Sequence, residues 1–239
     1  PPDAMPGPRA RPGCHDRGVA AASDRPTAEP SGSELTASLV PVGVMLAVMW
    51  VLEIVDTVAG GRLDQHGIRP RRLDGLDGIA WSPFLHGGYS HLIANTVPFA
   101  LLGGAIALGA LKRFALVTLI VAVVGGAGTW LTGPANTVHI GASGLVFGYL
   151  TYLLTRGLFA RNVLYLLGGV VVFMVYGGVL WGVLPAPGIS WQGHLFGAIG
   201  GVLAAYLLHA DRSDQPARTG SGKRKSLIDR LSPPGYEGT

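Results

Sequence analysis

The sequence contains 239 residues, of which 49% are hydrophobic and only 13% are charged. Soluble domains of this length usually have about 25% charged residues, so the composition excludes an ordinary water-soluble enzyme. The 18 Lys and Arg residues outnumber the 14 Asp and Glu residues, giving a net charge of +4. Every carboxylate lies at or before Asp77 or at or after Asp211. Residues 78–210 therefore cannot supply an acidic metal ligand or an acidic catalytic group.

The only cysteine, Cys14, lies in a segment rich in Pro, Arg and Gly. A disulfide framework, a thiolate metal site and a buried catalytic thiol are therefore excluded. The sequence also has no HExxH motif, and we predict neither a metal site nor any other cofactor. The first apolar run begins near Leu39 and several more follow, so we predict a membrane span there and not a cleaved secretory signal.

The apolar runs predict an all-α membrane protein, a bundle of six transmembrane helices. Residues 1–36 and the basic residues 211–239 lack apolar periodicity and are predicted to be disordered tails. The segment between them, residues 37–210, contains six stretches long enough to cross a hydrocarbon core of about 30 Å. The predicted spans are 37–57, 90–110, 113–132, 142–156, 163–183 and 192–209.

The basic residues predict that both termini are cytoplasmic. Cytoplasmic connections are enriched in Lys and Arg near helix ends. Lys112 and Arg113 separate the second and third spans, and Arg156 and Arg161 separate the fourth and fifth. The alternate connections, 132–141 and 185–190, contain no Lys, Arg, Asp or Glu.

One connection departs from this charge rule. The predicted outer loop, residues 58–89, contains four arginines and three aspartates that alternate with apolar residues, as in a loop lying along a membrane surface. Glu53 and Asp56 precede it at the outer end of the first span. We expect both side chains to snorkel to the membrane interface.

Polar side chains within spans are functional candidates because burying them in lipid is costly. Counting about 1.5 Å per helical residue from the predicted inner ends places Ser143, His194 and Asn95 in the outer third of the bilayer. On the second span, His91 and Asn95 are four residues apart and therefore share one helix face. Their ring and amide N–H groups are suited to stabilising a developing oxyanion.

Glycine spacing predicts close contact between the fourth and sixth spans. Gly193, Gly197 and Gly201 repeat every four residues, as do Gly144 and Gly148. Such small faces allow two membrane helices to approach at backbone distance. Because Ser143 adjoins one face and His194 borders the other, the two side chains are predicted to be able to touch.

Four sequence elements resemble the rhomboid family of intramembrane serine proteases. They are His86, the HLIAN run from His91 to Asn95, GASG at 141–144 and GHLFGAIGG at 193–201. Their order, their separate helices and the six-span topology are also similar, across about residues 39–209. A lone GxSG is weak evidence, whereas all four elements in register are specific.

The resemblance implies an intramembrane serine endopeptidase that cleaves transmembrane segments near the outer membrane face. Ser143 would be the nucleophile and His194 its general base, in a dyad without a carboxylate. His91 and Asn95, with the Ser143 backbone N–H, would be the oxyanion contacts.

The resemblance also implies supporting roles. Phe147 would pack against the catalytic ring, His86 would support the nearby loop, and Gly141 and Gly144 belong to the GASG motif. We expect no role for the remaining histidines singled out, which are His66, His139 and His209.

One feature departs from the family pattern and two other functions stay open. Many family members have a Trp-Arg pair in the first outer loop, whereas this sequence has GIRPR at 67–71. The alternatives are a catalytically inactive rhomboid-like protein that binds membrane clients, and a six-span transporter using His91, Asn95 and His194.

The expected partners are single-span or multi-span membrane protein substrates and the lipid bilayer, with no nucleic acid. We expect a multi-pass protein of a bacterial plasma membrane, and the oligomeric state stays open.

Overall fold

The regular elements are helices throughout the part of the chain that the structure describes. This computed structural model describes residues 32–160 and 188–209, with isolated positions at 167, 170, 174 and 184. Within these ranges the only β-type pairing is an isolated antiparallel bridge between Ile68 and His139. The long helices are α1 (Gly32–Ala59), α3 (Tyr89–Gly109), α4 (Leu111–Thr132), α5 (Ser143–Ala160) and α7 (Trp191–Leu207).

These helices occupy five of the six predicted spans. By length and composition, α1, α3 and α4 can each cross a membrane, while α5 and α7 coincide with the predicted fourth and sixth spans. The predicted span 163–183 and the predicted tail 211–239 lie outside the described residues, apart from the isolated positions. Helix α1 begins at Gly32, so residues 32–36, predicted as part of the tail, are helical.

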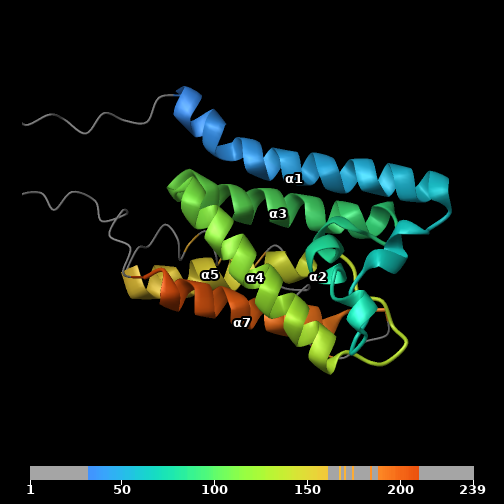
Figure 1. Cartoon of the computed structure of the whole chain (residues 1–239). Helices are drawn as coiled ribbons and strands as arrows, with labels where there is room; N and C mark the ends of the chain where they lie inside the picture. The colour runs from blue at the N-terminus through green and yellow to red at the C-terminus, as the bar shows by residue number, and fades with distance from the viewer. Residues whose placement is uncertain are drawn as a thin grey trace, which may run out of the picture. The chain divides into compact units, whose positions relative to one another are not determined.

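Glycine faces bring α7 directly against α4 and α5 (Figure 1). A Cβ atom added at Gly197 would overlap the carbonyl oxygen of Gly144, and one added at Gly201 would overlap that of Gly148. On the α4 side, a Cβ atom at Gly125 would lie 3.4 Å from the Gly197 Cα. The predicted approach of the fourth and sixth spans at backbone distance is therefore present in the structure.

An aromatic cluster joins α3, α4 and α5. The buried Tyr149 ring lies 5.6 Å from the Phe99 ring and 5.9 Å from the Phe114 ring, centroid to centroid. Its hydroxyl forms a hydrogen bond of 2.7 Å with Thr118 Oγ1. A buried phenol usually finds such a partner, and the interaction fixes α5 against both neighbours.

The first loop, residues 60–88, is built from four short helical pieces and folds back over the end of α1. These pieces are η1 (Leu63–His66), η2 (Leu73–Gly75), α2 (Gly78–Trp81) and η3 (Ser82–Phe84).

This loop overturns one prediction. Glu53 and Asp56 do not snorkel: their side chains are 4% and 6% exposed. The Leu63 N–H donates to Asp56 Oδ1 at 2.6 Å, so the loop covers the Asp56 carboxylate. Asp64 of the loop interacts with the Glu53 and Asp56 carboxylates. Burial raises the pKa of Asp64 to about 6, with smaller contributions from the charges of Asp56 and Glu53.

The glycine contact leads to a test of stability. Gly197→Ala inserts a methyl group against the Gly144 backbone, and overpacking of this kind typically costs about 1–3 kcal/mol. We expect a lower thermal midpoint in detergent, measured by circular dichroism.

Gly43→Ala on α1 is the matched control, because nothing lies within 4 Å of its added Cβ atom. It should leave the midpoint unchanged or slightly higher, since Ala favours helix over Gly. Equal midpoints for the two variants would contradict the close contact.

Candidate active site

Ser143 and His194 are hydrogen-bonded to each other at the contact between α5 and α7. The distance from His194 Nε2 to Ser143 Oγ is 2.7 Å. Ser143 is the first residue of α5 and is half-buried, while His194 lies in the first turn of α7 and is 7% exposed. Two residues that are 51 positions apart in the sequence are thus within proton-transfer distance.

The Phe147 ring lies flat against the His194 ring. Their centroids are 4.4 Å apart and their planes differ by 11°. Phe147 is one turn after Ser143 on the same helix, so α5 contributes both the hydroxyl and the surface on which the imidazole rests. This stacking restricts rotation of the imidazole about its side-chain bonds.

His91 lies against the segment that leads into Ser143. A Cβ atom on Gly141 would be 2.6 Å from His91 Cε1, and Gly141 has a φ of 113°, so position 141 needs glycine for both reasons. The Gly87 N–H donates to His91 Nδ1 at 3.4 Å. In the neutral ring the hydrogen therefore lies on Nε2, the nitrogen nearer to Gly141.

Asn95 lies one turn further along α3 and is 5% exposed. Its amide donates one hydrogen to the His91 carbonyl oxygen at 2.9 Å. A side-chain amide has two N–H hydrogens, so one donor is left for another acceptor.

His86 supports the GASG segment through a backbone hydrogen bond. The Ala142 N–H donates to His86 Nε2 at 3.3 Å, and the His86 ring meets the His91 ring edge to face at a centroid distance of 5.1 Å. His86 is only 1% exposed. Burial, and secondarily the charge of His91, lower the pKa of His86 to about 4.

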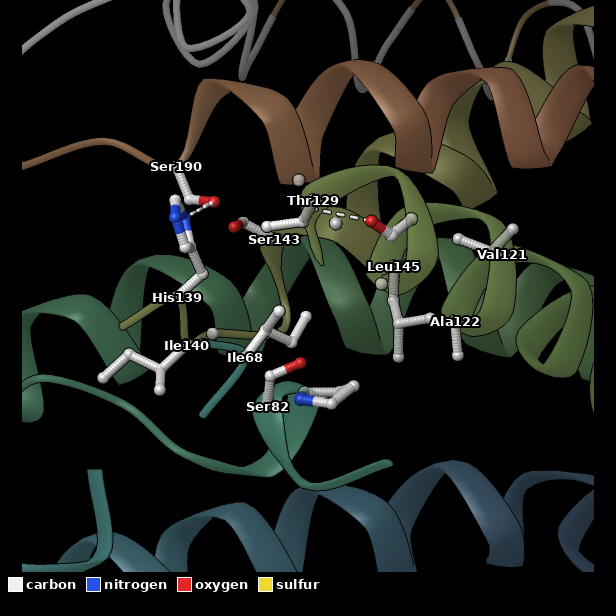
Figure 2. A pocket seen from close by; sticks show the side chains of 16 residues that line it. Ile68, Ser82, Val121, Ala122, Thr129, His139, Ile140, Ser143, Leu145 and Ser190 are labelled. Carbon is white, nitrogen blue, oxygen red and sulfur yellow. Dashed lines mark hydrogen bonds between the residues drawn. The ribbon is translucent and has the colours of Figure 1, made fainter. Parts of the chain in front are cut away.

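Ser143 also lines a small cavity with a partly polar wall (Figure 2). The cavity has a volume of about 40 Å³, and one water molecule needs roughly 10–15 Å³. The cavity can therefore hold a few water molecules next to the Ser143 hydroxyl. Its other side-chain polar groups come from Ser82, Thr129, His139 and Ser190.

His139, for which the sequence predicted no role, forms a second hydrogen-bonded pair with Ser190. His139 Nδ1 lies 2.7 Å from Ser190 Oγ, the pair joined by a dashed line in Figure 2. A signal was present in the spacing: His139 is four residues before Ser143, and Ser190 is four residues before His194. His66, for which no role was expected either, is exposed on η1.

The GIRPR segment, which stands in place of the family's Trp-Arg pair, is fixed to the site by its backbone. The N–H of Ile68 donates to the His139 carbonyl at 3.0 Å, and the His139 N–H donates back at 2.9 Å. The Arg71 N–H donates to the Trp130 carbonyl at 2.9 Å, and its guanidinium donates to the Gly133 carbonyl at 2.8 Å. The first loop thus contacts both ends of the α4–α5 connection.

Among the described residues, no group of three His, Cys, Asp or Glu side chains is arranged to hold a metal ion.

Comparison with known proteins gives one family and several bacterial relatives. Residues 76–211 match the sequence model of the Rhomboid domain. An uncharacterised protein of Mycobacterium tuberculosis is 42% identical over 225 residues, which cover 87% of this chain and 94% of that protein. An uncharacterised protein of Mycobacterium leprae is 47% identical over 180 residues, covering 72% of this chain and 71% of that protein.

A more distant relative has a functional name. The Bacillus subtilis protein YdcA, described as a candidate rhomboid protease, is 34% identical over 128 residues, covering 52% of this chain and 62% of that protein. The matched domain includes all the site residues from His86 to His194.

The lowered pKa of His86 predicts a pH-dependent stability. Its folded pKa of about 4 lies below the unfolded value of about 6.5, so its contribution to stability is present above pH 6.5 and is lost as the pH falls towards 4. Up to about 3 kcal/mol is involved. We expect His86→Gln to flatten this part of the stability profile, measured by chemical unfolding between pH 4 and 7.

His66→Gln is the control for this test, because that histidine is exposed on η1. The control should keep the pH dependence of the unmodified protein. A His86→Gln variant with an equally steep profile would show that the pKa of His86 is not lowered.

Proposed function

Because this chain belongs to the rhomboid family, we propose that it is an intramembrane serine endopeptidase that cleaves transmembrane segments of membrane proteins near the outer membrane face. Members of this family act on membrane proteins within the bilayer. The observation that carries the proposal is the 2.7 Å hydrogen bond between Ser143 Oγ and His194 Nε2. A hydroxyl and an imidazole at this distance can act as a nucleophile and its general base.

The first step is acyl transfer. Ser143 Oγ attacks the carbonyl carbon of the scissile peptide bond while His194 Nε2 takes the hydroxyl proton. The imidazolium then returns that proton to the leaving amine as the C–N bond breaks, which leaves an acyl-enzyme ester on Ser143. A neutral His194 that accepts at Nε2 carries its hydrogen on Nδ1.

The second step is hydrolysis of the ester. Water from the adjacent cavity, which has room for a few molecules, attacks the ester carbonyl while His194 takes its proton. The Ser143 oxygen then leaves and recovers a proton from His194. A water-accessible cavity is essential here because the hydrocarbon core itself contains no water.

The negative charge on the carbonyl oxygen needs donors in both steps. Ser143 is the first residue of α5, so its N–H has no carbonyl partner within the helix and lies at the positive end of the helix dipole. The Nε2–H of His91 and the second amide hydrogen of Asn95 are the proposed side-chain donors. The contact between His91 and Gly141 supports the His91 assignment.

The substrate class follows from the location of the site. A transmembrane helix hides its peptide groups in hydrogen bonds, so it must unwind locally before Ser143 can attack. Segments with small or helix-breaking residues near the outer boundary should therefore be cleaved best. We place the protein in the plasma membrane of a bacterium, with both termini cytoplasmic.

The catalytic pair is tested with a purified single-span test substrate in detergent. Ser143→Ala and His194→Ala should each lower the cleavage rate by about 10⁴-fold or more, measured by gel densitometry of the product. Chelators should have no effect.

The matched controls are Ser38→Ala, at a half-buried position near the start of α1, and His66→Ala, at an exposed position on η1, and both should cleave normally. Cleavage that persists in Ser143→Ala would falsify the proposal. Substrate binding without cleavage by the unmodified protein would favour the client-binding alternative, and solute movement into liposomes would favour the transporter.

The role of Asn95 is tested separately. Removing a true oxyanion donor lowers the turnover number by about 10²-fold or more, so Asn95→Ala should slow turnover to that extent with little change in KM. Steady-state kinetics on the same substrate measure both parameters.

Thr96→Val is the control on the neighbouring residue, which accepts a hydrogen bond from the Trp50 indole at 3.2 Å. It removes a polar contact of α3 with α1 and should change stability more than turnover. If both variants slow turnover equally, Asn95 acts only in packing.

A further inference from the structure

Two serine–histidine hydrogen bonds join the same two chain segments. Along each segment, the residue in one bond lies four positions from the residue in the other. One links Ser143 to His194 and the other links His139 to Ser190, and both distances are 2.7 Å. In each pair the partners are 51 residues apart. The order of the residue types is reversed, because the histidine of the second pair comes from the segment that carries Ser143.

The hydrogen-bond partners fix the neutral tautomer of His139. Thr137 Oγ1 donates its only hydrogen to the Pro134 carbonyl at 2.7 Å, so it can only accept from His139 Nε2, which lies 2.9 Å away. Nε2 therefore carries the hydrogen, and Nδ1 accepts the hydroxyl hydrogen of Ser190. Burial lowers the pKa of His139, which keeps this neutral form at neutral pH.

Ser190 is the residue through which this bond reaches His194. It directly precedes α7, and its carbonyl accepts the His194 N–H at 3.2 Å in the first turn of the helix. A shift of Ser190 would therefore shift His194 with it.

His139 is held firmly at its own end. Its backbone forms two hydrogen bonds with Ile68, and its side chain is 8% exposed. It also lines the cavity beside Ser143, together with Ser190. The bond thus joins a fixed point near the start of α5 to the start of α7.

We propose that His139 is a positioning residue that holds the start of α7 through Ser190 and so sets the distance between His194 and Ser143. This inference rests on the proposed function, in which that distance governs proton transfer. A misplacement of about 1 Å between reacting groups can cost about 10²-fold in rate.

The experiment measures how fast a fluorophosphonate probe labels Ser143, alongside turnover of the single-span substrate. We expect His139→Leu and Ser190→Ala each to slow both rates by about 10- to 100-fold. Because each change breaks the same bond, the double variant should be no slower than the slower single variant. His66→Leu is the matched control and should label like the unmodified protein.

A conservative replacement separates positioning from general support of the fold. In His139→Asn the side-chain oxygen takes the place of Nδ1 as acceptor for the Ser190 hydroxyl, so we expect labelling within a few-fold of the unmodified rate. A His139→Leu variant that unfolds at lower temperature but labels at the normal rate would overturn the proposal.

A second measurement does not depend on activity. Amide hydrogen exchange over residues 191–195 should speed up in His139→Leu relative to residues 200–205, because the first turn of α7 loses its anchor. Unchanged exchange would overturn the inference even if the unmodified protein neither labels nor cleaves, a result that would separately overturn the proposed function. Labelling that persists in Ser143→Ala and disappears with Ser190→Ala would make Ser190 a nucleophile and likewise overturn the positioning role.

Discussion

The backbone contact between α5 and α7 governs the geometry of the site. Gly197 lies against Gly144, and Gly201 lies against Gly148, so neither helix can move closer and any larger side chain would push them apart. Ser143 immediately precedes Gly144, and His194 is three residues before Gly197. Serine is a short side chain, and its hydroxyl reaches an imidazole on a neighbouring helix only when the two backbones are this close. The 2.7 Å hydrogen bond therefore depends on the glycine spacing.

Residues 78–210, which include both Ser143 and His194, contain no carboxylate. Several contacts around the pair are made by neutral groups. Phe147 stacks on His194, while the buried histidines 86 and 139 accept hydrogen bonds from Ala142 N–H and from Ser190. Each can accept only while it is neutral, and burial lowers the pKa of both rings. An arrangement of neutral groups also avoids the desolvation cost of a buried ion pair.

Much of the fold could be predicted from the sequence because membrane spans depend on local composition. The bounds of α3, α4 and α7 lie within two residues of prediction, and the glycine repeat pointed to the approach of Ser143 and His194. Interactions made by the loops could not be predicted in this way. The burial of Glu53 and Asp56 depends on the first loop folding back over α1, and the bond of His139 depends on Ser190, which lies in a separate connection. Both contacts join residues from separate elements, and they form only when the loops adopt their folded path.

The first loop is attached to the site by backbone hydrogen bonds and by the Arg71 guanidinium. The loop has two ion pairs, Arg69–Asp74 and Arg72–Asp74, in which 33–57% of each side chain is exposed. Such exposed pairs contribute roughly 0–1 kcal/mol to the free energy of unfolding. The loop is held instead by backbone hydrogen bonds from Ile68 to His139 and from Arg71 to Trp130. The Ile68 bonds end on the segment that precedes Ser143, and the Arg71 bond ends on α4. Removing the backbone contact of Ile68 therefore acts on the same segment as a change at His139, whereas neutralising Asp74 removes only exposed ion pairs within the loop.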